Sequence, residues 1–102
     1  MALFPATSNS NIKIKEAESS EVTITGNGVM TVTLAVPSIT GYTPKLGIYK
    51  GFYIPLSQSY ATVISYVISA EIVSSNYSLY LYNFTGTSRT GVAKANIIYT
   101  KD

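Results

Sequence analysis

Carboxylates are the first side chains to consider as chemical groups, because the chain offers few others. It has no histidine and no cysteine, which excludes imidazole acid–base chemistry, thiol nucleophiles, disulfides and thiolate metal sites. Glu16, Glu18 and Glu21 lie close together in the sequence and could form a glycosidase pair or a calcium site. Catalytic carboxylates usually sit on separate rigid strands that face one cleft. We therefore interpret the three as solvated charges, and we expect no enzyme, metal or cofactor.

Two glycine-containing segments could be mistaken for phosphate-binding loops: GNG at 26–28 and TGTSRTG at 85–91. Neither carries the Gly-Lys-Ser or Gly-Lys-Thr that opens a helix in a P-loop, so both are interpreted as turns between strands. Arg89 lies in the second segment and is a candidate ligand-binding residue. The alternative is a loop charge that only aids solubility.

Tyrosine gives the strongest compositional signal, with nine tyrosines and no tryptophan. A tyrosine ring is flat and apolar with a polar tip, which suits both protein interfaces and stacking on sugars. About half of them are expected to be structural. We select Tyr53 and Tyr77, together with Arg89, as candidate ligand contacts.

These side chains must be positioned by strands, because apolar and polar residues alternate with period two along most of the chain. The two alternating runs around GNG predict a β-hairpin. Residues 37–44 are predicted to be a loop bracketed by prolines, and Gly51 is predicted to end the strand after it. The run at 60–73 also fits a helix face, but its β-branched residues favour a strand. The predicted strands cover residues 12–15, 22–25, 30–36, 46–50, 60–73, 79–84 and 93–100.

Short strands at regular spacing, without helical crossovers, predict an all-β fold: an antiparallel β-sandwich or a small barrel of about seven to eight strands. Residues 1–11 are interpreted as an N-terminal arm or linker, and 12–102 as a single domain. The last strand, at 93–100, is expected to lie inside its sheet.

Charge and hydropathy exclude several classes of partner. The net charge is +2, and the lysines are scattered rather than gathered into the dense stripe that nucleic acid requires. No stretch is long and apolar enough for a membrane helix, so no membrane insertion is expected. The N-terminal MALFPATSNS lacks the charged and apolar regions of a signal peptide.

One predicted strand is apolar on both faces. Tyr80, Tyr82 and Phe84 share one face, while Leu79 and Leu81 share the other. One face covers the core, so the second is expected to cover a neighbouring subunit or a ligand. Ile98, on the outward face of the last strand, repeats this pattern. We predict a homo-oligomer with Tyr80, Tyr82 and Ile98 at the subunit interface, because a small β-domain gains core area by association.

Two long segments, VTITGNGVMTVTLAVPSITGYTPKLGIYKG and LYNFTGTSRTGVAKANIIYTKD, resemble the opening and the end of a family of small domains. These are C-terminal domains of tail fibres, receptor-binding proteins and related structural proteins of Gram-positive phages and prophages. The likeness covers most of 20–102. It implies a jelly-roll β-sandwich, often trimeric, on a virion, with no shared catalytic residues and a structural role for Tyr42 and Pro44.

The sequence thus predicts a non-enzymatic phage or prophage virion protein, a tail-fibre or receptor-binding tip. It would be made in the bacterial cytoplasm, assemble as an oligomer with a trimer favoured, and bind a host cell-surface saccharide. The alternatives are a carbohydrate-binding module of a secreted protein and a pilin-like structural subunit.

Overall fold

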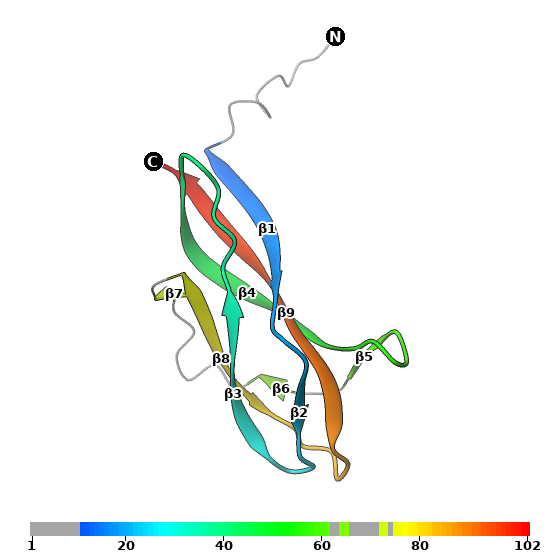
Figure 1. The fold of residues 1–102 in the computed structure, drawn as a ribbon. Helices are drawn as coiled ribbons and strands as arrows, with labels where there is room; N and C mark the ends of the chain where they lie inside the picture. The colour runs from blue at the N-terminus through cyan, green and yellow to red at the C-terminus, as the bar shows by residue number, and fades with distance from the viewer. Residues whose placement is uncertain (1–10, 62–63, 66–71, 74) are drawn as a thin grey trace.

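The computed structural model describes residues 11–61, 64–65, 72–73 and 75–102 (Figure 1). No helix long and apolar enough to cross a membrane occurs among them. The strands are β1 (Ile12–Glu18), β2 (Val22–Ile24), β3 (Val29–Ala35), β4 (Tyr42–Ile54), β5 (Ser59–Ala61), β6 (Ile64–Ser65), β7 (Ile72–Val73), β8 (Asn76–Tyr82) and β9 (Arg89–Lys101).

All strand pairs in this part of the chain are antiparallel, and they form two sheets. Sheet A has five strands in the order β1-β9-β4-β5, with β2 also paired to β9. Sheet B has four strands in the order β3-β8-β6, with β7 also paired to β8. The predicted all-β sandwich is therefore confirmed, whereas the jelly-roll connectivity implied by the resemblance stays a prediction.

The core lies between the sheets and is built by alternate residues of their central strands. In β9 the odd-numbered positions from Gly91 to Tyr99 are buried, and in β8 Tyr77, Leu79 and Leu81 are buried. Phe52 of β4 is fully buried with them. Burying a side chain of this size contributes about 1.5–3 kcal/mol. The last strand is central in sheet A, between β1 and β4, as its sequence position predicted.

One edge of sheet A is formed by β1 and β2 in succession, with Ser19 in the segment between them. Glu18 pairs with Lys94 and Val22 with Gly91, so β2 continues the edge that β1 begins. Between them, the Ser19 amide donates to the Ala93 carbonyl, and its hydroxyl accepts from the Ala93 amide, both at 2.9 Å. The buried hydroxyl thus replaces a backbone acceptor in the ladder.

The hairpin predicted around GNG is wrong. The turn exists, since the Gly28 amide donates to the Thr25 carbonyl and Asn27 has a φ of 57°. However, β2 pairs with β9 in sheet A, whereas β3 pairs with β8 in sheet B. The turn therefore carries the chain from one sheet to the other, and each flanking strand has a ladder partner remote in sequence.

The predicted boundaries of β4 are also wrong. Pro44 lies inside the strand, opposite Tyr99, and Gly51 lies inside it opposite Lys94. Register shifts occur at Pro44/Leu46 and Tyr49/Gly51. A bulge accommodates a proline without its N–H and a glycine with a φ of 146°, which favours glycine. One strand of 13 residues thus runs through both supposed breaks.

Two predictions fall partly outside the described residues. In the run 60–73, the described parts belong to β5, β6 and β7, while 62–63 and 66–71 lie outside. Of the predicted arm, only Asn11 is described; its carbonyl accepts from the Lys101 amide.

Candidate functional site

Tyr77 does not lie in a loop, and it cannot serve as a surface contact in this fold. It belongs to β8, only 1% of its surface is exposed, and its hydroxyl donates to the Gly47 carbonyl at 3.1 Å. Its ring packs on Gly47, where an added Cβ would lie 2.6 Å from the ring. Burial raises the pKa of its hydroxyl. Tyr77 thus ties sheet B to sheet A, and the prediction that it contacts a ligand is withdrawn.

Tyr53 does lie at the surface, on the outer face of sheet A. It is half-buried and opposite Val92 of β9. Its ring meets the Tyr60 ring edge-on, with centroids 5.3 Å apart, and Lys94 Nζ lies 4.6 Å from its centroid. Tyr60 also covers Gly51, where a Cβ would approach the ring to 2.6 Å. The result is an aromatic pair with a cation beside it, which suits stacking contacts.

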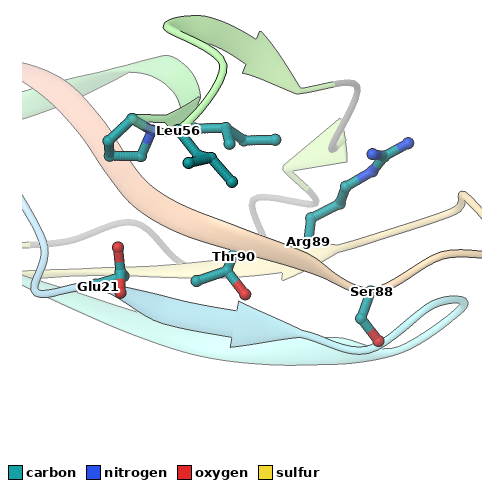
Figure 2. A pocket seen from close by; sticks show the side chains of 7 residues that line it. Glu21, Leu56, Ser88, Arg89 and Thr90 are labelled. Carbon is teal, nitrogen blue, oxygen red and sulfur yellow. The ribbon is translucent and has the colours of Figure 1, made fainter.

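Arg89 lines a hollow at the start of β9, shown in Figure 2. The hollow has a volume of about 410 Å³, and its walls are apolar on the side of the turn after β4 and polar on the side of β9. The lining residues are Glu21, Ile54, Pro55, Leu56, Ser88, Arg89 and Thr90. The hollow holds an acid, a base and two hydroxyls beside apolar groups, the mixture that a small polar ligand requires. Tyr53 is next to Ile54 in sequence but does not line it.

The Arg89 side chain has a buried polar atom that no described residue satisfies. Its Nε is buried, and no atom of the described residues accepts a hydrogen bond from it. A buried N–H of this kind has a substantial desolvation cost, so Arg89 stays the best-supported of the predicted ligand contacts.

The predicted subunit contacts do not come together. Tyr80 and Tyr82 lie on the outer face of sheet B, opposite Thr31 and Val29 of β3. The ring centroids of Tyr82 and Phe84 are 6.4 Å apart, so these two rings lie together, with Phe84 just beyond the end of β8. Ile98, in contrast, lies on the other side of the sandwich, on the outer face of sheet A.

Ile98 has neighbours that sequence reasoning missed. Ile14 of β1 and Leu46 of β4 are both directly opposite Ile98, and together the three form a line across sheet A, named here the apolar row. Ile14 is 63% exposed and Leu46 is 48% exposed. Alternation predicted a half-buried β1, but its isoleucines face outward. Only the strand register, which the sequence does not show, aligns the three residues.

The acidic residues Glu16 and Glu18 belong to an ionic cluster beside the apolar row. Glu16 pairs with Lys50 and lies 3.7 Å from Lys94, which is 3.6 Å from Glu18. The hydrogen bond from Lys50 lowers the pKa of Glu16, and the same bond raises the pKa of Lys50. Each carboxylate thus has a lysine partner, and two acids balance two bases.

Comparison with known proteins gives no further assignment. No protein-family model matches the chain, and neither curated proteins nor solved structures give a significant match.

Proposed function

We propose that this chain is a non-enzymatic structural subunit of a phage or prophage virion, of the tail-fibre or receptor-binding type, which assembles with copies of itself. The observation that supports the proposal most is the exposure of large apolar side chains on the outer faces of both sheets. The most exposed of those in described strands are Ile12, Ile14, Val29, Leu46, Ile48, Tyr60 and Val73.

An outward apolar face carries a cost in water that a contact with another copy removes. The sandwich fold already provides a core, with Leu34, Leu81 and Ile97 fully buried, so these outer residues are not needed to complete it. Sheets whose faces and edges are exposed can make repeated contacts between copies, as a fibre requires. The resemblance described above adds the virion setting and favours three copies.

A carbohydrate-binding role is the second candidate, and the Tyr53–Tyr60 pair favours it. Its rings stand at an interplanar angle of 68°, so only one of them can stack flat on a sugar. The polar side chains that line the hollow at Arg89 would supply hydrogen bonds to the hydroxyls of the sugar. Within the main proposal, this region is the contact with a cell-surface saccharide.

The test is the mass of the protein in solution, measured by light scattering after size exclusion. We expect an oligomer for the wild-type chain and a lower mass for the double variant Tyr80→Ser/Tyr82→Ser, because that change removes the aromatic face of sheet B. Thr31→Ser, a small change on the same face, is the matched control and should keep the wild-type mass.

An unchanged mass in the double variant would remove Tyr80 and Tyr82 from the interface. A wild-type chain that stays monomeric yet binds a polysaccharide would replace the assembly proposal with the carbohydrate-binding one.

A further inference from the structure

The outer face of sheet A carries the apolar row and the ionic cluster side by side, and together they indicate what kind of protein surface could bind there. The apolar row crosses the three strands β1, β9 and β4, and Ile12 and Ile48 flank it with 55% and 52% exposure. Directly opposed side chains on neighbouring strands have Cβ atoms about 5 Å apart. The apolar row is therefore a continuous strip across the sheet.

The outer face formed by β1, β9 and β4 combines apolar and polar rows. Three strands about 4.8 Å apart, with four outward rows about 6.8 Å apart, cover about 400 Å². Two of these rows contain Glu16, Glu18 and Lys94, so the apolar part is smaller than the whole face. The whole face is about half of what each partner buries in a standard interface, so a contact through this face alone is weak.

Charge is distributed unevenly about the central strand. Glu16 and Glu18 lie on β1, whereas Lys50 lies on β4, and Lys94 lies between them on β9. A symmetry operation that exchanges β1 with β4 therefore places acid opposite base. The cluster has no net charge, so two copies do not repel each other through it.

We propose that a second copy of this chain packs on the outer face of sheet A about a two-fold axis roughly parallel to β9. The axis sets Ile98 against the partner's Ile98 and Ile14 against the partner's Leu46. It also sets Glu18 of β1 against the partner's Lys50. This contact deepens the proposed self-assembly, on which it rests, by adding a second interface opposite the aromatic face of sheet B.

A two-fold axis perpendicular to the strands fits less well. Passing through the apolar row, it would place each strand against its own copy, and Ile12 would meet the partner's Glu16. That contact would bury the ion pairs of Glu16 with Lys50 and Lys94 against an apolar side chain, and burying an ion pair has a desolvation cost. The parallel axis is the arrangement that satisfies the apolar row and the charges together.

The absence of cysteine from the chain makes thiol crosslinking a clean test. The full-length chain carries a single cysteine in place of Ile98, Ile14 or Leu46, and a thiol-specific crosslinker of about 10 Å reach bridges stacked sheets. We expect Ile98→Cys to link to itself at least tenfold faster than Ser38→Cys. Ser38 is exposed in the loop between β3 and β4, outside the strands of both sheets, and serves as the control.

Ile14→Cys and Leu46→Cys should link poorly when each is alone and efficiently when the two are mixed. Circular dichroism of each variant establishes that the strands are retained. If Ile14→Cys links to itself as readily as to Leu46→Cys, the two-fold direction is wrong.

Solution mass separates this proposal from the previous one. An oligomer in which Ile98→Cys reacts no faster than Ser38→Cys overturns the sheet A contact and leaves the assembly function standing. A chain that remains monomeric at high concentration, with no crosslinking, overturns both.

Discussion

At the scale of single residues, Asn83 is the most highly connected polar group among those described. It is fully buried, and its Nδ2 donates to the carbonyls of Ile24 and Thr87, each at 3.0 Å. Its Oδ1 accepts from the amide and the hydroxyl of Thr85. All four hydrogen-bonding positions of the side chain are used, which ties the loop before β9 to the end of β2.

Asn83→Asp should therefore destabilise the domain by about 3 kcal/mol, because the carbonyls of Ile24 and Thr87 lose their donor and meet a buried carboxylate. Urea unfolding followed by circular dichroism measures the change. Thr87→Ala is the matched control, because Thr87 contributes its backbone carbonyl and should cost less than about 0.5 kcal/mol. Equal stability of Asn83→Asp and wild type would contradict the role given to this network.

At the scale of elements, the packing of β8 on β4 depends on a glycine. An added Cβ at Gly47 would lie 2.6–2.8 Å from the Tyr77 ring, whereas one at Gly86 would meet nothing within 4 Å. Gly47→Ala should therefore destabilise the fold by about 1–3 kcal/mol through overpacking, while Gly86→Ala stays near wild type. Thermal unfolding of the two variants measures this difference, and equal melting temperatures would contradict it.

The elements also mark where sequence reasoning succeeds and where it fails. Alternation correctly predicted the inward faces of β8 and β9, because side-chain direction follows from local geometry. It missed that β2 and β3 belong to different sheets, since pairing partners are set by tertiary contacts. Tyr77 was wrongly assigned to the surface, although it continues the alternation of Leu79 and Leu81 and therefore faces the core. Ile98 lies on an outward face as predicted, and its role at a subunit interface stays a prediction.

At the scale of the whole molecule, buried tyrosines link stability to alkaline pH. Burial raises the pKa of Tyr49 to about 12 and also raises the pKa values of Tyr77 and Tyr99. The folded state holds these protons where the unfolded chain, with tyrosine pKa values near 10, releases them. The contribution of these tyrosines to the free energy of unfolding should therefore be fully present below pH ~10, and it should be lost as pH rises towards ~12.

Absorbance at 295 nm and far-ultraviolet circular dichroism, recorded together from pH 8 to about 13, should show two steps. Exposed tyrosines ionise first, and the buried ones ionise together with the loss of strand signal. Tyr49→Phe should move the second step to higher pH, because the buried Tyr49 hydroxyl has no hydrogen-bond partner among the described residues. A single step with an unchanged strand signal would refute the linkage.

The central place of β9 has a consequence for biosynthesis. β1, β2 and β4 each take β9 as a ladder partner, yet β9 is the last of these strands to leave the ribosome. Until β9 has emerged, β1 and β2 have no ladder partner in sheet A, and β4 has only β5. Sheet A can therefore close only after its middle strand has been translated, when β9 joins β1 and β2 to the β4–β5 pair.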